Sequence, residues 1–325
     1  MSKMKEPSYI PPFTVTAKAI NLVAEISALI ERYAIRLEKS DGLLLRKVNR
    51  IKTIHSSLAI EGNKLSEDQV RDIIDGKNVI APLREIQEVK NAMKTYELYP
   101  KLNPFNEKDL LKAHGVMMNS LTDDAGRFRH GGVGVFAGEK CVHLAPPATR
   151  VPFLIGDLFD WLKHSKDHLL IRSCVFHYEF EFIHPFSDGN GRMGRMWQTL
   201  LLMQWKPIFA WLPVETIVKE NQQKYYDAIA LSDKQGNSTA FITFMLKCIL
   251  ASLKEMCESN QKSNQKSNQK VLSAISENPD ITINELQTLI GLSESGIKKI
   301  LRQLRNDGVI VRIGGAKGGH WEILK

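Results

Sequence analysis

Twelve consecutive residues, from His184 to Arg195 (HPFSDGNGRMGR), carry most of the chemistry that the sequence offers. His184 is the group in this stretch that can accept a proton near neutral pH, which suits a general base. Asp188 is a hard oxygen ligand, of the kind that Mg²⁺ on a polyphosphate prefers. Arg192 and Arg195 are three residues apart, so on a helix their side chains share roughly one face. The combination predicts a site for a phosphate-bearing substrate.

Two apolar runs must hold this stretch in place. Residues 174–183 before it and residues 193–203 after it are rich in large apolar side chains, and both runs are predicted to be buried helices. The polar residues then lie in a short loop that opens the second helix. Glycines flank Asn190 there, so backbone N–H groups stay unobstructed. With the positive end of the helix dipole, these groups predict an anion-binding site.

Each piece of the stretch has a simpler explanation when it is taken alone. A single histidine is more often structural, and Asp-Gly-Asn-Gly alone usually forms a turn. A turn, however, needs neither paired arginines after it nor a histidine before it. The combination therefore favours a catalytic phosphate site.

The stretch resembles the signature of the Fic family, His-x-Phe-x-(Asp/Glu)-Gly-Asn-Gly-Arg-x-x-Arg, and matches it at every defined position. The resemblance implies an all-α fold with a Fic-type helical core and a small β-hairpin flap. It also implies transfer of AMP from ATP, with Mg²⁺, to Ser, Thr or Tyr hydroxyls of a target protein and of the enzyme itself. His184 is then the general base, and Asp188 holds Mg²⁺. The nucleotide-binding residues are Gly189, Asn190, Gly191, Arg192, Met193, Gly194 and Arg195.

A second motif lies at the end of a helix predicted over about residues 43–62, where Ser57 and Glu61 are four residues apart on one face. The helix dipole disfavours an anion in the last turn, so Glu61 needs water or a cationic partner. A solvated glutamate is the simpler interpretation. Ser-x-x-x-Glu-Gly also resembles the inhibitory motif of many Fic proteins. That resemblance implies that Glu61 pairs with Arg195 at the ATP γ-phosphate position and blocks productive binding.

The pattern changes at residues 133–144. Two short strand-like runs, residues 133–136 and 141–144, are separated by a turn and predict a β-hairpin. Such a hairpin in a helical protein exposes edges that can accept an added strand, although a plain connector is the alternative. The resemblance favours the Fic flap, on which a target protein would dock.

Three further candidates lie outside these motifs. Tyr226 falls on a predicted helix, and the resemblance places it beside the nucleotide, whereas packing against the core is the alternative. His114 lies on an amphipathic helix and is interpreted as a packing residue. His164 and His168 are four residues apart but have no third ligand nearby, so a solvated face is favoured over a metal site.

The chain after residue 258 has a different organisation. Ser-Asn-Gln-Lys occurs three times in residues 259–270, a repeat that predicts a linker or a solvated helical extension. Residues 271–325 show a helix, a helix–turn–helix and a glycine-tipped hairpin, and they resemble a winged helix. The third helix, which reads DNA in DNA-binding members, carries Lys298, Lys299, Arg302 and Arg305. From Lys270 on, eight Lys or Arg stand against six Asp or Glu, so DNA and protein both stay open as partners.

These patterns divide the chain into four predicted parts. They are an N-terminal helical region over 1–110, a Fic catalytic core over 111–250, a linker over 251–270 and a winged helix over 271–325. A chain of 325 residues is long enough for such an organisation.

The amino-acid composition limits the classes of protein to which the chain can belong. Four scattered cysteines without a Cys-x-x-Cys pair argue against a disulfide framework or a structural zinc site and predict a cytoplasmic location. Neither a signal peptide nor a membrane span is indicated. The net charge of +8 suits ATP, acidic proteins and DNA alike, and a homodimer is compatible with the sequence.

The same site leaves alternatives to AMP transfer. One is transfer of phosphate or phosphocholine, but phosphate-transferring Doc relatives depart from the Gly-Asn-Gly pattern at Gly191. Another is removal of AMP from a target, with Glu61 positioning water. A third is a transcriptional regulator whose Fic domain only senses nucleotide, although a sensor would not need His184 as a base.

Overall fold

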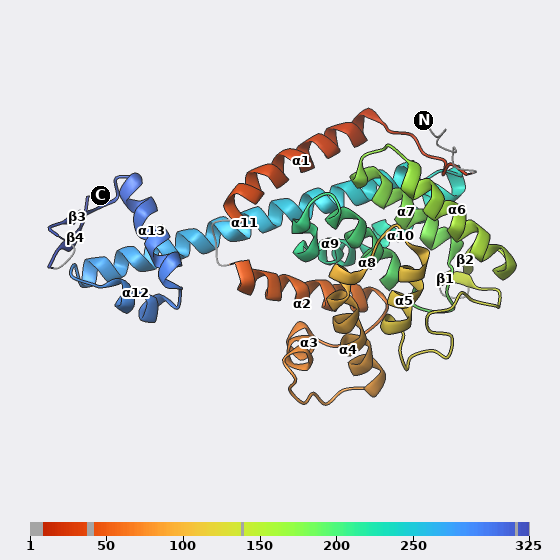
Figure 1. Cartoon of the computed structure of the whole chain (residues 1–325), viewed down its shortest axis with the longest axis horizontal. Helices are drawn as coiled ribbons and strands as arrows, with labels where there is room; N and C mark the ends of the chain where they lie inside the picture. Colours follow the sequence, from red (N-terminus) through yellow and green to blue (C-terminus); the bar gives the residue numbers. More distant parts are fainter. Residues whose placement is uncertain (1–8, 38–41, 138–139, 316–317, 325) are drawn as a thin grey trace. The chain divides into compact units, whose positions relative to one another are not determined.

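The computed structural model describes residues 9–37, 42–137, 140–315 and 318–324. The chain is predominantly helical and divides into two compact units, Met1–Ile30 with Arg46–Leu253, and Glu31–Leu45 with Lys254–Lys325 (Figure 1). Its strands form two small hairpins, so the predicted fold class is confirmed. Among the helices described, none is long and apolar enough to cross a membrane.

The helices and strands up to residue 277 follow one another along the chain. They are α1 (Ala17–Leu37), α2 (Gly42–Ile60), α3 (Glu67–Ile74), α4 (Leu83–Glu97), α5 (Glu107–Met117), β1 (Gly134–Ala137), β2 (Lys140–Leu144), α6 (Val151–His164), α7 (Leu169–Ile183), α8 (Asn190–Met203), α9 (Val214–Glu220), α10 (Gln222–Gln235) and α11 (Thr239–Glu277). Short 3₁₀ turns occur at Tyr99–Lys101, Ala148–Arg150 and Pro207–Trp211.

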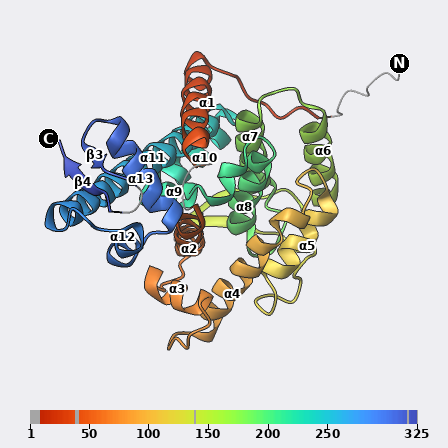
Figure 2. The ribbon, with the colours of Figure 1, turned by 60° about the vertical axis from the view of Figure 1, so that its left-hand side comes forward.

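The helices α7 and α8 form the centre of the first unit and lie side by side in both views (Figure 1, Figure 2). Every side chain of α7 from Ser173 to Phe180 is buried, as expected of a helix that is apolar on all sides. A Cβ at Gly194 would lie 2.8 Å from Glu181 Oε1 on α7, so this glycine permits the close approach of the two helices. Both predicted core helices are confirmed, and the second begins at Asn190.

The predicted N-terminal helix is α2, and it ends before the motif glutamate. Its last residue is Ile60, and Gly62 adopts a left-handed conformation with φ of +92°. The chain then enters α3 through Ser66, whose side chain accepts a hydrogen bond from the backbone of Gln69 in a capping box. Glu61 therefore lies in the turn directly after the helix.

The strands β1 and β2 pair antiparallel, with a register shift between Val135 and Phe136. The hairpin predicted over residues 133–144 is therefore present. The tip of its turn, residues 138–139, lies outside the described residues.

The Ser-Asn-Gln-Lys repeat lies inside α11, which continues without a break from Thr239 to Glu277. Of the two forms considered for residues 251–270, the structure has the helical extension. The second unit continues with α12 (Ile283–Ile290), α13 (Glu294–Asn306), β3 (Ile310–Ile313) and β4 (His320–Ile323). The predicted winged-helix order is confirmed.

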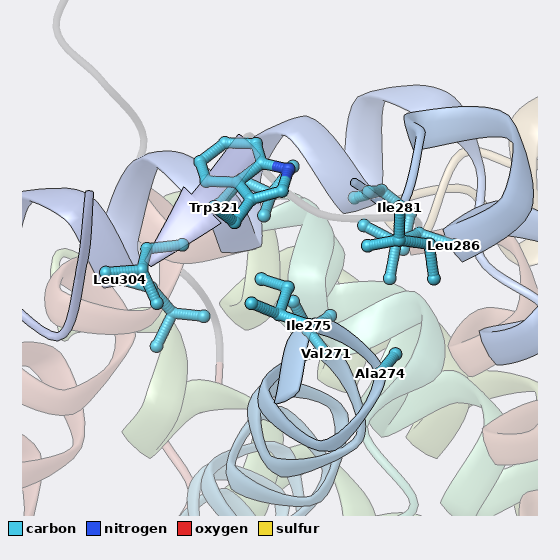
Figure 3. Packing of buried hydrophobic residues seen from close by; sticks show 10 residues of the cluster. Val271, Ala274, Ile275, Ile281, Leu286, Leu304 and Trp321 are labelled. Carbon is cyan, nitrogen blue, oxygen red and sulfur yellow. The ribbon is translucent and has the colours of Figure 1, made fainter. Parts of the chain in front are cut away.

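The second unit buries a hydrophobic core of its own (Figure 3). Side chains of α11, among them Ile275, face Leu304 of α13 and the ring of Trp321 on β4. Ile281 and Leu286 belong to the same cluster. The residues after the repeat therefore pack as a domain rather than as a tail.

Two leucines on α12 test this core. Leu286 is fully buried, whereas Leu289 is 64 % exposed. Leu286→Ala should lower the free energy of unfolding of this unit by about 2–5 kcal/mol, because it removes buried apolar atoms and leaves a cavity. Leu289→Ala is the matched control and should change it by less than about 0.5 kcal/mol. Hydrogen exchange of the α12 and α13 amides measures both, and equal effects would contradict the core assignment.

Candidate functional site

The signature loop joins α7 to α8 in a conformation fixed by its own residues. His184 ends α7 with φ of 50° and ψ of 62°, which is unusual for a residue with a side chain. The Asn190 side chain accepts from the Phe186 backbone N–H at 2.9 Å and donates to the Phe186 carbonyl at 2.8 Å. Asn190 thus closes the loop with its side chain, and the first backbone N–H groups of α8 are left for an anion.

The two loop glycines leave space that no side chain could share. Gly189 has φ of +86°, and a Cβ there would lie 2.7 Å from Met118 Sδ. A Cβ at Gly191 would collide with the Glu61 carboxylate and lie 2.9 Å from Arg195 Nη1. The carboxylate of Glu61 therefore occupies the space directly over the start of α8. Of the other nucleotide-binding candidates, Met193 is fully buried.

The structure brings the N-terminal motif and the second signature arginine together. Arg195 Nη2 donates to Glu61 Oε1 at 2.7 Å and to the Ser57 carbonyl at 3.0 Å, and Arg195 Nε donates to Ser57 Oγ at 3.1 Å. The Arg195 side chain is 3 % exposed. Burial by itself would lower the pKa of Arg195, but the neighbouring Glu61 carboxylate raises it above its ordinary value. Arg195 is thus a buried cation whose charge is balanced by Glu61.

His184 has the geometry of a proton acceptor. Its Nδ1 lies 3.3 Å from the Glu181 carbonyl, a contact that favours the proton on Nδ1. The ring is half-buried. With the proton on Nδ1, Nε2 is the nitrogen that carries the lone pair, so the ring can accept a proton there.

Arg129 holds this loop and was not identified from the sequence. It is 3 % exposed, and its guanidinium donates to the carbonyls of His184 at 2.7 Å, Gly131 at 2.8 Å and Pro146 at 2.5 Å. Burial lowers its pKa below the ordinary value. Arg129 therefore ties the base to both sides of the hairpin. A lone arginine in a loop carries no sequence signal that would have revealed this role.

His114 also supports the loop, so its interpretation as a packing residue is incomplete. Its Nδ1 accepts from the Gly126 backbone N–H at 2.9 Å, which leaves the proton on Nε2. That proton is donated to the Asp188 carbonyl at 3.0 Å. The ring stacks on Phe186, with centroids 3.6 Å apart. Burial lowers the pKa of His114 to about 4, so it acts here as the neutral imidazole.

Asp188 presents a carboxylate that is 41 % exposed. Its Oδ1 accepts from the Gly189 backbone N–H at 2.6 Å and from Arg192 at 2.8 Å, and its Oδ2 accepts from Arg84 at 3.1 Å. No cluster of three or more His, Cys, Asp or Glu side chains suited to a metal occurs among the described residues. One carboxylate is nevertheless sufficient for Mg²⁺ that arrives on phosphates and keeps its waters. The donor set fits such an ion.

Tyr226, the predicted nucleotide neighbour, follows a second tyrosine, Tyr225, on α10, and the two differ in burial. Tyr225 is buried, and its hydroxyl lies 3.1 Å from His177 Nε2. Tyr226 is 42 % exposed, with its hydroxyl 3.4 Å from Gln222 Nε2. Gln222 also donates to the Ile60 carbonyl at 3.0 Å. Tyr226 thus lies near the end of α2, on the side that carries Glu61.

Family and structure comparisons agree with this geometry. Residues 104–202 match the family model described as Fic/DOC family, and residues 265–311 match one described as winged helix-turn-helix DNA-binding. A crystal structure of a Fic family protein from Desulfovibrio desulfuricans G20 is 44 % identical, with a TM-score of 0.76, over 97 % of this chain and 98 % of that chain. Fic-1 from C. elegans is 22 % identical with a TM-score of 0.62, covers 77 % of this chain and 74 % of that chain, and shows likeness in fold alone.

Curated relatives match a shorter part of the chain. Protein adenylyltransferase Fic from Culex quinquefasciatus is 32 % identical over 210 residues, which are 61 % of this chain and 40 % of that protein. Its counterpart from Drosophila melanogaster is 30 % identical over 226 residues, 65 % of this chain and 43 % of that protein. The chain therefore spans less than half the length of these relatives.

The neutral His114 predicts a pH dependence of stability. Its pKa is about 4 when folded and 6.5 at its ordinary value, so the unfolded chain binds this proton first as the pH falls. The contribution of neutral His114 to the free energy of unfolding is intact above about pH 6.5 and is lost progressively toward pH 4. Between about pH 7.5 and about pH 5, the wild type should lose roughly 1–2 kcal/mol more unfolding free energy than His114→Gln. Urea denaturation of both proteins at the two pH values measures this difference in unfolding free energy. Equal losses in the wild type and in His114→Gln would contradict the role of neutral His114.

Proposed function

Because the chain belongs to the Fic family, we propose that it is a protein adenylyltransferase restrained by its own Glu61. It transfers AMP from ATP to Ser, Thr or Tyr hydroxyls of a target protein and of itself. The match to curated adenylyltransferases supports this activity, and the 44 % identity to the Desulfovibrio protein extends the family likeness over the whole chain.

One observation carries the proposal. The Glu61 carboxylate lies over Gly191 at the start of α8 and accepts a hydrogen bond from the buried Arg195. A helix N-terminus with an arginine beside it is a site for anions, and here an anion from the chain itself fills it. A phosphate has the same charge sign and the same hydrogen-bonding needs. We infer that the Glu61 carboxylate acts as a stand-in for a phosphate group at this position.

The residues around this position suit the reaction. The first N–H groups of α8, with Arg192 and Arg195, bind and orient the phosphates of ATP. Asp188 would hold Mg²⁺, which supplies charge neutralisation on the polyphosphate when it is bound. His184 Nε2 accepts the proton of the target hydroxyl. The hydroxyl oxygen then bonds to the α-phosphorus as the bond to pyrophosphate breaks.

Two supports keep the base in register with the phosphates. Arg129 holds the His184 carbonyl, and His114 holds the Asp188 carbonyl, so the two ends of the loop are fixed from different elements. Arg129 also contacts Gly131 and Pro146, at the base of the hairpin. A target segment added to the edge of the hairpin would then lie in a fixed relation to His184.

The restraint follows from competition for Arg195. In the resting protein Arg195 contacts Glu61, and the outermost phosphate of ATP would need the same guanidinium. While Glu61 stays, the nucleotide binds with its α-phosphate misplaced for attack. A misplacement of ~1 Å can lower a rate by ~10²-fold.

Removal of the carboxylate should release the enzyme. Glu61→Gly should raise self-modification by about 10²-fold, because Arg195 becomes free for phosphate. Ser57→Ala should raise it less, since Ser57 only supports the pair. Arg195→Ala should not activate, because it removes a phosphate ligand with the restraint. Autoradiography with α-³²P-ATP at saturating nucleotide measures each variant.

Matched variants decide between the alternatives. Glu97→Gly removes another exposed glutamate at the end of a helix and should have no effect. Adding His184→Ala to Glu61→Gly should lower the rate by about 10²–10⁴-fold. Equal activity of wild type and Glu61→Gly would contradict the restraint. Label from γ-³²P-ATP alone would indicate phosphate transfer, and wild type that strips label from modified Glu61→Gly protein would indicate AMP removal.

For the second unit we infer DNA binding as a separate function. The match to a winged helix-turn-helix DNA-binding model supports it. Ser293 caps the start of α13, and Arg302 and Arg305 are exposed along that helix. Lys298 forms an ion pair with Glu294 on its own helix, so the two arginines are the stronger candidates for phosphate contacts.

Fluorescence anisotropy with duplex DNA tests this function. Arg302→Ala with Arg305→Ala should weaken binding and reduce its salt dependence, because fewer phosphates are neutralised. Lys101→Ala removes one exposed positive charge in the first unit and should leave binding unchanged. Absence of binding by the wild type at low salt would favour a protein partner for this unit.

A further inference from the structure

Arg84 of α4 reaches the active-site carboxylate from outside the signature. Its Nη2 donates to Asp188 Oδ2 at 3.1 Å, and its Nη1 donates to the Leu121 carbonyl at 3.4 Å. The other oxygen, Oδ1, already accepts from Arg192 at 2.8 Å and from the Gly189 N–H at 2.6 Å. Both carboxylate oxygens of Asp188, the predicted metal ligand, therefore accept hydrogen bonds. One of the donors, Arg84, comes from the N-terminal helices.

We propose that Arg84 is the resting counter-cation of Asp188 and that Mg²⁺ displaces it when nucleotide binds. The inference rests on the proposed function. A guanidinium and a divalent cation at the same carboxylate oxygen would lie within a few ångströms of each other, where like charges repel strongly. Arg84 must therefore leave Oδ2 for the metal to be held there.

The two arginines on Asp188 differ in how easily they can leave. The Arg192 side chain is 4 % exposed, and it is four residues from Asp188 at the start of α8. The Arg84 side chain is 58 % exposed, and its remaining contacts, to Leu121 and at 3.6 Å to Glu88, are long. Exposed ion pairs of this kind are weak. Arg84 is therefore the arginine that leaves Asp188 when the metal binds.

Glu88 can hold the Arg84 side chain beside the site after Arg84 has left Asp188. Glu88 lies one turn further along α4, with its Oε1 3.6 Å from Arg84 Nε and 3.7 Å from Arg192 Nη1. Its Oε2 accepts from Asn63 Nδ2 at 2.8 Å, which fixes the Glu88 carboxylate against the turn after Glu61. Arg84 can thus move off Asp188 and keep Glu88 as a carboxylate partner.

This exchange has a measurable thermodynamic consequence. Without metal, Arg84 neutralises Asp188 and lets the phosphates approach. With metal, Mg²⁺ takes over that task and Arg84 only competes. Removal of Arg84 should therefore weaken nucleotide binding in EDTA. In Mg²⁺ it should leave nucleotide binding unchanged or make it stronger. The ratio of the two dissociation constants, Kd in EDTA over Kd in Mg²⁺, should rise.

Calorimetric titration of ADP into the full chain measures this ratio. ADP is not consumed by transfer, and it lacks the γ-phosphate that competes with Glu61. Arg84→Gln should raise the ratio about three- to tenfold, as expected for loss of an exposed pair in one condition and of a competitor in the other. Arg84→Lys keeps the charge and should raise it less.

Arg71→Gln is the matched control, because Arg71 pairs with Glu67 and Asp68 on its own helix and should leave the ratio unchanged. A ratio unchanged in Arg84→Gln would make the pair incidental and overturn the inference. A lower ratio would make Arg84 a phosphate ligand of the metal-bound complex and overturn it equally. Wild-type protein that binds no ADP in Mg²⁺ would overturn the proposed function as well, whereas normal wild-type binding confines the failure to Arg84.

Discussion

The structure of the site depends on the burial of one cation. Arg195 lies on α8 against α7 and α2, where a guanidinium without a counter-charge would be strongly unfavourable. Glu61 and Ser57 satisfy it from the end of α2. A second carboxyl, Glu215, lines a small cavity together with Arg195, and burial raises the pKa of Glu215 to about 7. Glu61 differs from Glu215 because it accepts a hydrogen bond directly from the Arg195 guanidinium.

The helices before the signature are part of the site. The turn after α2 contributes Glu61 and Asn63, and α4 contributes Arg84 and Glu88. Their contacts form one continuous network, from Asn63 through Glu88 to Arg192, whose guanidinium contacts Asp188 in turn. A disturbance of Glu61 therefore acts on a turn that is connected through Glu88 to the side chains of Arg192 and Asp188.

The signature loop is held more firmly than its length suggests. A left-handed His184 is a conformation that a residue with a side chain keeps only when its surroundings impose it. Asn190 closes the loop from within, Arg129 holds one end, and His114 holds the other. Such over-determination suits a site in which a base and a phosphate must stay in register.

The sequence by itself determined the helical class, the hairpin and the winged-helix order, because these depend on spacing within a few residues, which the chain displays directly. The pairing of Glu61 with Arg195 was implied only by the resemblance of two motifs to the Fic family, since the two residues are 134 positions apart and the tertiary structure brings them together. Only the tertiary structure revealed the contacts that Arg129, His114 and Arg84 make with the signature loop. Their partners lie 55, 74 and 104 residues away along the chain. Single polar residues in ordinary helices and loops carry no periodic pattern, so only the packing of α4, α5 and the hairpin base around the loop brings these side chains to His184 and Asp188.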